Sequence, residues 1–382
     1  MTEADTGRAA PDWDPRAPEE FADQVRAYDE LRERCPVAHS EYLGWSLLRH
    51  DDVAAAAADH VTFSSRVSAY LSVPSGMDPP EHSAHRRINE RYFTPDRMSR
   101  LEPELRRIAG ELVDALPRAV PVELMEHLAE PYALRAQSAF MGWSEVNGTL
   151  SAWARRNHAA TISGDRTATA AVAREFDEHI RAVLARRRVV PADDVTTELL
   201  GETVGGRALT DEEIVSVIRN WTAGELGTIA ASVGILAHAL ATRPDVRAHL
   251  TARPADIGPA TDELLRITPP LIANRRVTTC PVLVGGRAIE PGERVTLLWA
   301  SANRDESVFG DPDEFRLDRD PAANLLYGTG IHACPGAPLA RLELRVLVEE
   351  LLARTTVLTA VEAAVPAHYP AGGLATVTMV LG

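Results

Sequence analysis

Residues 327–341 read YGTGIHACPGAPLAR and place Cys334, one of three cysteines in the chain, among glycines and prolines. Gly328 and Gly330 allow backbone conformations that other residues rarely adopt. Apolar residues recur at helical spacing in the segment that follows, so a helix is expected to begin just after Cys334. Because a helix N-terminus stabilises negative charge, this position favours a thiolate that can bind a metal; a small buried core cysteine is the alternative.

The composition indicates a large, soluble, cytoplasmic protein. Its 382 residues are 45% hydrophobic and 25% charged, enough to bury a substantial core. No apolar run approaches the roughly 20 residues of a membrane-spanning helix, and the acidic N-terminal stretch does not resemble a signal peptide. The net charge of -15 disfavours nonspecific nucleic-acid binding. Three widely spaced cysteines argue against a disulfide framework or a cysteine-rich metal site.

Periodicity predicts a mainly helical chain with small sheets at its edge, forming a single domain over residues 1–382. The predicted helices are Phe21 to Arg34, Arg100 to Leu116, Asp177 to Arg187, Asp211 to Thr242 and Pro338 to Arg354. The predicted strands are EYLGWSLL (41–48), VLVGGRAI (282–289), RVTLLWA (294–300) and LATVTMVLG (374–382).

The order Tyr-Gly-x-Gly-x-His-x-Cys-x-Gly-x-x-Leu-Ala-Arg in the cysteine loop closely resembles the haem-ligand loop of the cytochrome P450 family. The resemblance implies the cytochrome P450 fold and haem b, an iron protoporphyrin IX, with the Cys334 thiolate as proximal iron ligand. It implies that His332 reaches a haem propionate and that Gly328 and Gly336 shape the loop. Tyr327 departs from the family, which usually has Phe there, but keeps an aromatic wall.

A second motif of the family is Glu-x-x-Arg, matched by Glu263 and Arg266 in TDELLRITPP. At a separation of three the two side chains share a helix face and can pair. The later segment FGDPDEFRLDR resembles the family's meander, where Arg319 completes a Glu-Arg-Arg cluster. We expect these three residues to have a structural role, holding the cysteine loop.

Further basic residues match the family's propionate contacts. His82 and Arg86 lie four apart on one predicted helix face, for which a solvated basic helix is the alternative. In NRRVTTCPVLVGGRAI, counting back from the glycine pair selects Arg276 over Arg275. Arginine suits this task because its planar fork binds both oxygens of a carboxylate.

The long central helix matches the family's oxygen-activation helix only in part. Ala223 and Gly224 resemble the small-residue pair that leaves room for oxygen above the iron. Leu226 and Gly227 occupy the positions where most members have an acid and a threonine that relay protons. The usual acid-alcohol pair is therefore missing in register.

Two neighbours are candidates for the missing proton relay. At about 100° per residue, Ala223 and Gly227 share one helix face, Thr228 is turned partly off it and Glu225 points to nearly the opposite side. Thr228 is therefore the better candidate. The alternative for Glu225 is a polar residue on a buried helix that pairs with a neighbouring group.

The substrate pocket is expected to be lined by residues 63–77, by the region 140–185 and by the segment PPLIAN, 269–274, as in the family. These segments are more polar than a purely lipidic substrate requires, which favours an aromatic or peptide-like substrate. The candidate contacts are Arg66, Tyr70, Trp143, Trp153, Arg156, Asn157, His158 and Asn274.

The resemblance implies a monooxygenase that acts on a small or medium organic substrate, in biosynthesis or catabolism. Ferredoxin and ferredoxin reductase are the expected electron donors, as separate proteins, and the chain is expected to be a monomer. Oxidative cross-linking of aryl or phenol groups on a peptide or aromatic substrate is one alternative, and a non-catalytic haem-binding protein is another. A basic donor-docking patch is expected at Arg87, Arg91, Arg341 and Arg345.

Overall fold

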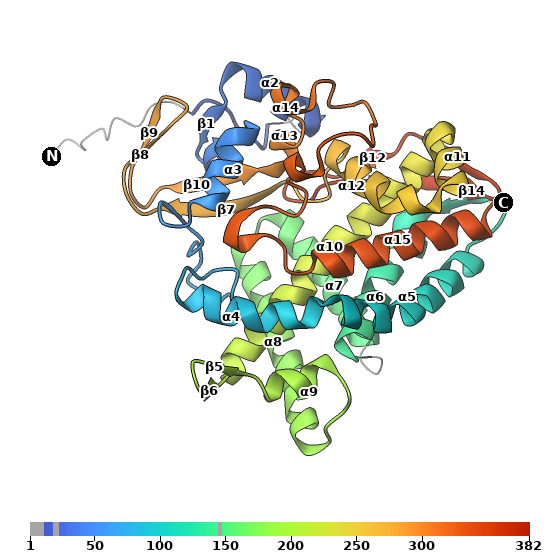
Figure 1. The fold of residues 1–382 in the computed structure, drawn as a ribbon, viewed down its shortest axis with the longest axis horizontal. Coiled ribbons are helices and arrows are strands. Elements are labelled where there is room, and N and C mark those ends of the chain that lie inside the picture. Colours follow the sequence, from blue (N-terminus) through green and yellow to red (C-terminus); the bar gives the residue numbers. More distant parts are fainter. Residues whose placement is uncertain (1–10, 18–22, 144–146) are drawn as a thin grey trace.

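The computed structural model describes residues 11–17, 23–143 and 147–382, and helices dominate it (Figure 1). The helices are α2 (Gln24–Arg34), α3 (His50–Ala58), α4 (Glu81–Glu90), α5 (Pro95–Ala115), α6 (Glu130–Met141), α7 (Asn147–Ser163), α8 (Arg166–Val189), α9 (Val195–Leu200), α10 (Asp211–Thr242), α11 (Pro244–Ala252), α12 (Ile257–Ile267), α13 (Trp299–Ala302), α14 (Glu306–Phe309) and α15 (Ala337–Arg354).

The central helix α10 has the bounds that the sequence predicts. The Thr210 hydroxyl accepts from the Glu213 backbone N–H and the Glu213 carboxylate accepts from the Thr210 N–H, a capping box that fixes its start. The helix α8 is longer than predicted, because Asp165 caps the Ala- and Thr-rich segment before residue 177. The first residues of the predicted helix 21–34 lie partly outside the described residues, and α2 begins at Gln24.

The strands form small sheets beside the helices, at the left of Figure 1 and along the chain's C-terminal end. The largest sheet has the order β1 (Val37–Ser40), β2 (Gly44–Leu47), β10 (Arg294–Leu298), β7 (Ala273–Thr278) and β3 (Phe63–Ser64). The other sheets pair β11 (Leu358–Ala360), β14 (Thr378–Leu381) and β4 (Pro121–Glu123); β12 (Val365–Pro366) and β13 (Leu374–Thr376); β5 (Thr203–Val204) and β6 (Arg207–Ala208); and β8 (Val282–Val284) and β9 (Arg287–Ile289). The predicted class, mainly helical with small sheets, is confirmed.

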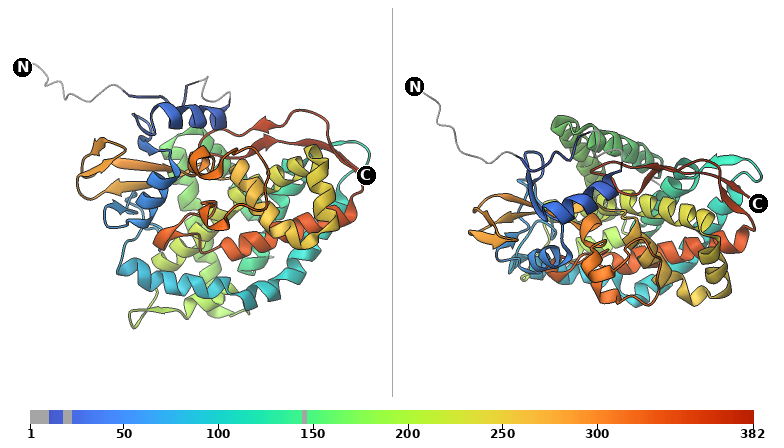
Figure 2. Two further views of the ribbon diagram at one scale, coloured as in Figure 1. Left: turned by 45° about the horizontal axis from the view of Figure 1, so that its top comes forward. Right: turned by 90° about the horizontal axis from the view of Figure 1, so that it is seen from above.

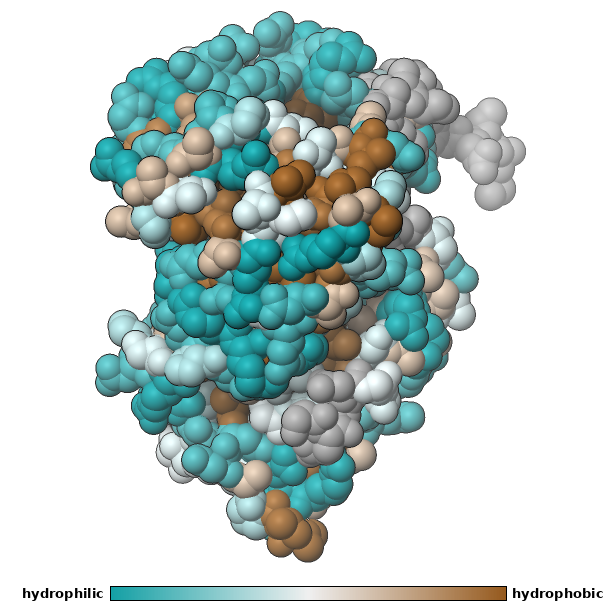
Figure 3. Space-filling model, turned by 90° about the vertical axis from the view of Figure 1, so that its right-hand side faces the viewer, coloured by the Kyte–Doolittle hydropathy of each residue, from teal (hydrophilic) through white to brown (hydrophobic). Residues whose placement is uncertain are grey.

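Helix α10 runs through the middle of the molecule, and α6, α8, α12 and α15 pack around it, while α5 packs against α15 (Figures 1 and 2). Among the described residues it is the one helix long and apolar enough to cross a membrane, yet 61% of that stretch is buried inside the protein, as in the core helix of a globular domain. The outer surface, seen from one side in Figure 3, is mainly hydrophilic.

Candidate functional site

The cysteine loop folds back on itself before α15. Gly328 and Gly330 have φ angles of 67° and 71°, and the Cys334 N–H donates to the Tyr327 carbonyl (2.8 Å). A Cβ atom at Gly330 would lie 2.7 Å from the Ala57 carbonyl oxygen of α3, so a side chain there would collide with backbone. The loop therefore delivers Cys334 to the N-terminus of α15, as the sequence predicts.

The Cys334 side chain is accessible although protein atoms surround it closely. The residue is exposed, yet burial within the protein raises the pKa of its thiol. The backbone N–H groups of Gly336 and Ala337 and the Arg86 guanidinium oppose that rise. The expected stabilising effect of the helix start is present, but burial outweighs it. A metal that replaces the thiol proton supplies the missing positive charge.

Four basic side chains gather around this loop, and of these Arg86 alone forms an ion pair among the described residues, with Glu90 (2.9 Å). The rings of His82 and His332 lie 4.3 Å apart between centroids. Both ring nitrogens of His82 and Nε2 of His332 are buried without a hydrogen-bond partner among the described residues. Burial lowers the pKa of both rings, and the charges of His82 and Arg276 help to lower that of His332 to about 3.

The two arginines complete the basic group. Arg276 is 7% exposed, and its Nη1 donates to the Arg275 carbonyl (2.9 Å), while no acidic side chain of the described residues forms an ion pair with it. Arg86 Nη1 donates to the Ala333 carbonyl (2.6 Å) and thereby ties α4 to the cysteine loop. Buried donors without acceptors fit an anionic guest, and haem carries two carboxylates. The residues present thus fit a haem whose iron meets Cys334.

The central helix supplies an open wall. Ala223, Gly224 and Gly227 are exposed although they lie in the middle of α10, and a Cβ atom at either glycine would meet nothing within 4 Å. The Thr228 hydroxyl donates to the Gly224 carbonyl (2.8 Å), so its oxygen is left as an acceptor. The helix is regular here, and these positions provide space rather than an acid.

Glu225 turns away from that wall. Its carboxyl group is buried, and it faces Gln137 of α6 and the buried Glu343 of α15. Burial raises the pKa of both carboxyl groups. Sequence reasoning missed Glu343, although a signal existed: at four residues after Leu339, it falls on the apolar face of its helix.

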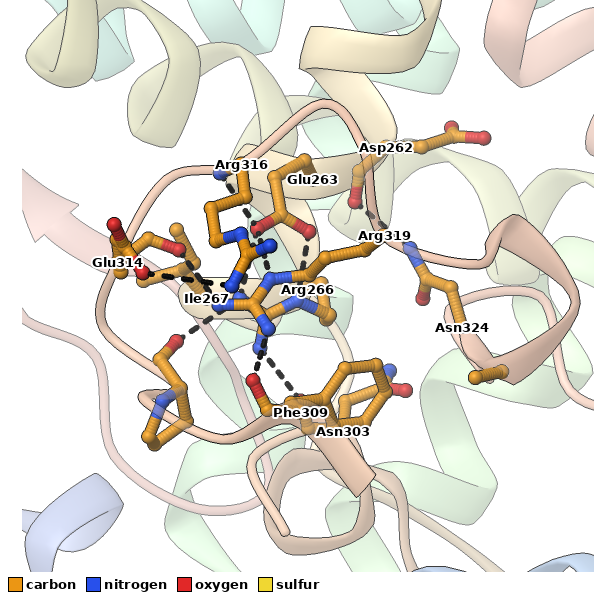
Figure 4. Close-up of polar contacts among 12 residues, drawn as sticks. Asp262, Glu263, Arg266, Ile267, Asn303, Phe309, Glu314, Arg316, Arg319 and Asn324 are labelled. Carbon is orange, nitrogen blue, oxygen red and sulfur yellow. Dashed lines mark hydrogen bonds and ion pairs between the residues drawn. The ribbon is translucent and has the colours of Figure 1, made fainter. Parts of the chain in front are cut away.

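Glu263, Arg266 and Arg319 form the expected Glu-Arg-Arg cluster (Figure 4). Arg266 donates to both Glu263 oxygens (2.8 and 2.9 Å), and Arg319 Nε donates to Glu263 Oε1 (3.0 Å). Arg266 also donates to the carbonyls of Asn303 (2.8 Å) and Pro312 (3.0 Å). The Asn303 side chain in turn accepts from the backbone N–H of residue 325 (2.7 Å), which leads into the cysteine loop. The cluster thus pins the segment before the loop.

Tyr327 lies in a small polar cluster of its own. The Arg341 guanidinium sits over its ring, 4.4 Å from the centroid, and donates to Asp262 (3.0 Å). Burial and the neighbouring Asp262 charge raise the pKa of the Tyr327 hydroxyl. The tyrosine therefore keeps the expected aromatic wall and places its hydroxyl toward the Asp262 and Arg341 pair.

The structure separates the candidate substrate contacts into different environments. Trp143 is fully buried and donates to the Thr196 hydroxyl (2.8 Å), and Trp153 is 4% exposed, so both are core residues. Their place in the core gives both residues a packing role, and their contact with a substrate stays a prediction. Arg156 forms an ion pair with Glu175.

The remaining candidates stay predictions. Arg66 is already paired with Glu81 (2.6 Å) and Asp78 (3.5 Å). Tyr70 is 71% exposed. Asn274 accepts from Trp299 Nε1 (2.8 Å) and is exposed, Asn157 is partly buried, and the His158 side chain lies outside the described residues.

The expected basic docking patch is largely neutralised. Arg91 pairs with Glu202, Arg341 with Asp262, and Arg345 with Glu102 and Glu349. Arg87 is exposed. Sequence reading did not foresee these partners because all but Glu349 lie far from the arginines in the chain.

A polar row on the first half of α10 is a further feature that sequence reading missed. The Ser216 hydroxyl accepts from the Val73 N–H (2.8 Å), and Asn220 donates to the Val73 carbonyl (3.1 Å). Arg219 donates to the Leu71 carbonyl (2.7 Å) and pairs with Asp177 of α8. Polar residues at spacings of three and four on an otherwise apolar helix were the available signal.

The family model and the similar proteins identify the same family. The family model for cytochrome P450 matches residues 260–378, which hold Glu263, Arg266, Arg319 and the cysteine loop. The chain is 34% identical to the cyclomarin C epoxidase CymV of Salinispora arenicola, over 85% of this chain and 87% of that protein. It is 36% identical to the erythromycin C-12 hydroxylase of Saccharopolyspora erythraea, over 87% and 88%.

Solved structures agree with the sequence comparison. The cytochrome P450 CYP109Q5 from Chondromyces apiculatus superposes with a TM-score of 0.87 at 29% identity, covering 96% of this chain and 97% of that one. The post-tailoring hydroxylase HmtN of himastatin biosynthesis superposes with a TM-score of 0.81 at 28% identity, covering 91% and 94%.

Proposed function

Because the chain belongs to the cytochrome P450 family and is a haem b monooxygenase, we propose that it inserts one oxygen atom into a medium-sized organic substrate of secondary metabolism. The observation that carries the proposal is the placement of Cys334 beside a group of basic side chains and within electrostatic reach of the central helix at Glu225. His82 and His332 have ring nitrogens without partners among the described residues, Arg276 has no ion pair there, and Ala223, Gly224 and Gly227 lie exposed on the central helix.

The haem supplies activation of molecular oxygen when it is bound. The Cys334 sulfur is its proposed ligand, and the N–H groups of Gly336 and Ala337 stabilise the sulfur's negative charge. His82, His332, Arg86 and Arg276 hold the two propionates. The Glu263, Arg266 and Arg319 cluster acts on the site only by fixing the backbone that leads to Cys334.

Helix α10 contributes two glycines, which leave space, and the Thr228 hydroxyl oxygen, which can accept a hydrogen bond. Gly224 and Gly227 leave room where larger side chains would fill the space. The Thr228 hydroxyl proton is committed to the Gly224 carbonyl, so its oxygen can accept a hydrogen bond from a water molecule and orient that water's other proton. Thr228 is therefore the proposed positioning group for proton delivery, and Glu225 is not.

The proposed substrate is a bulky, partly polar scaffold, aromatic or peptide-like. The similar proteins are named as an epoxidase for cyclomarin C and as a hydroxylase at C-12 of erythromycin, which supports hydroxylation or epoxidation of such a scaffold. Tyr70, Asn157 and Asn274 remain the candidate contacts. Arg66 is a weaker candidate, because Asp78 and Glu81 already balance its charge.

Oxidative cross-linking of aromatic groups is the second candidate function. Leu226 and Gly227 favour it, because coupling inserts no oxygen atom and places a smaller demand on proton delivery. Product mass separates the two: a gain of one oxygen or a loss of two hydrogens.

We further propose that the protein is a cytoplasmic monomer that receives electrons from a separate ferredoxin and ferredoxin reductase. Since most of the expected docking arginines are paired with carboxylates, charge steering at that face is weaker than the arginine count implies. Screening a panel of macrocyclic, peptide and aromatic compounds for the spectral shift of the haem on binding, followed by product mass, tests the proposed function. Binding without any mass change under turnover would contradict it.

A further inference from the structure

Two carboxyl groups, Glu225 of α10 and Glu343 of α15, face each other in the interior where α5, α6, α10 and α15 pack together. Glu343 is fully buried. Neither of its carboxyl oxygens receives a hydrogen bond from a donor among the described residues. Glu225 follows the exposed Gly224 in α10, while its carboxyl group points into the helix bundle toward Gln137 of α6.

Few neighbouring groups donate hydrogen bonds to the two carboxyl groups. With the Gln137 amide oriented to satisfy both of its ends, its nitrogen donates to the two Glu225 oxygens (3.1 and 2.6 Å) and its oxygen accepts from Thr222 (3.0 Å). The Tyr132 hydroxyl donates to the Glu343 backbone carbonyl (2.7 Å), not to the carboxyl group.

No nearby cation is free to stabilise a negative charge on the pair among the described residues. Arg106 of α5 is the cation on this side, but it is held by Glu102, Glu349 and Glu350 at 2.6 to 2.9 Å. Across the bundle the proposed iron ligand, Cys334, is itself acidic. The pair therefore lies in an interior that contains no free positive charge among the described residues.

Two carboxylates in such a place cannot both be ionised, because each charge is poorly solvated and repels the other. One proton shared between them turns the repulsion into a strong hydrogen bond, in which the protonated carboxyl donates to the ionised one. The pair then titrates as a unit. A second proton neutralises it completely.

We propose that Glu225 and Glu343 form a single shared-proton site that takes up a second proton from solvent when the haem iron accepts an electron from its external donor. The electron makes the haem more negative by one charge, and a buried anion nearby becomes less stable. Proton uptake converts the carboxylate of the pair to a carboxylic acid, with no bond to the haem formed or broken.

The electrostatic link between the pair and the haem site is visible from the cysteine. The Glu225 charge adds to the burial that raises the pKa of Cys334. By reciprocity, negative charge at the sulfur and its iron favours the protonated form of the pair. The inference rests on the proposed ligation of iron by Cys334.

The test is the midpoint potential of the holoenzyme's haem iron, measured by spectroelectrochemistry from neutral pH up through the titration of the pair. For uptake of one proton per electron, the potential falls by up to about 59 mV for each tenfold fall in proton concentration. Glu225→Gln and Glu343→Gln should each flatten this slope. Glu212→Gln, an equal charge change at an exposed position of the same helix α10, should leave it unchanged.

A potential that does not vary with pH, or a slope that both glutamine variants retain, overturns the proposal. If the variants fail to hold haem, the infrared difference between reduced and oxidised wild-type holoenzyme decides. A carboxylic acid band gained on reduction and shifted in D₂O supports the shared-proton site, and its absence refutes it. Failure of Cys334 ligation is distinguishable, because it changes the carbon monoxide spectrum rather than the pH slope.

Discussion

Arg219 Nη1 lies 2.6 Å from Asp177 Oδ1, and this ion pair joins the central helix α10 to α8. The same guanidinium donates to the Leu71 carbonyl (2.7 Å), so one side chain ties the helix to α8 and to the segment proposed to line the substrate pocket. Both carboxylate oxygens of Asp177 accept from Nη1 (2.6 and 2.8 Å). Arg219 thus holds residue 71 and α8 against the central helix.

Arg219→Ala should therefore loosen residues 71–73. We expect faster backbone hydrogen exchange in that segment and about tenfold weaker substrate binding, which corresponds to about 1.4 kcal/mol. The matched control is Arg181→Ala, because Arg181 joins the same two helices through Glu212 at 3.4 Å but is exposed. Equal effects of the two substitutions would show that the ion pair has no special role at the pocket.

Glu263→Gln should destabilise the protein strongly. Arg266 is fully buried, and without the Glu263 charge it remains as an uncompensated cation, which costs about 3 to 5 kcal/mol. Denaturant unfolding and the fraction of haem retained measure the loss. Arg316→Ala is the control: its side chain forms an exposed pair with Asp318, so the change should cost less than about 1 kcal/mol. A small loss in Glu263→Gln would contradict the structural role of the cluster.

Stability should fall as the pH rises through the titration of the Glu225 and Glu343 pair. Burial raises the pKa of Glu225 from 4.5 to about 8 in the folded protein and raises that of Glu343 as well. A raised folded-state pKa means that the stabilisation is complete below pH 4.5 and is lost toward about pH 8. Thermal unfolding of Glu343→Gln should depend less on pH over this range than that of wild type. Parallel pH profiles would remove the pair from the account of stability.

Thr228→Ala should divert electrons into hydrogen peroxide while substrate binding stays nearly intact. A positioned proton donor or acceptor contributes on the order of 10² to 10⁴ in rate, so the loss of product per electron consumed should be clear. Glu225→Gln should change that yield less, because its carboxyl group faces Gln137 and Glu343 rather than the open wall of α10. The reverse order of effects would mean that Glu225, and not Thr228, serves the oxygen side.

The parts of the site that lie within one segment could be predicted from the sequence. The cysteine loop, the regular helix α10 and the pairing of Glu263 with Arg266 depend on local spacing, and family resemblance added His82, Arg276 and Arg319. The contacts between distant helices could not. Nothing in the spacing of α10 indicates that Glu225 meets Glu343, or that Asp177 meets Arg219, because a single sequence carries no information on which helix faces pack together.

The carbon monoxide spectrum of the reduced protein tests the central claim, that Cys334 binds the haem iron, most directly. The wild-type protein should show the long-wavelength absorption band of a thiolate-ligated haem, because sulfur donates electron density to the iron. Cys334→Ala should lose that band, and Cys280→Ala, a change of the same atoms at an exposed cysteine in the β7–β8 connection, should keep it. A band that persists in Cys334→Ala would contradict the account.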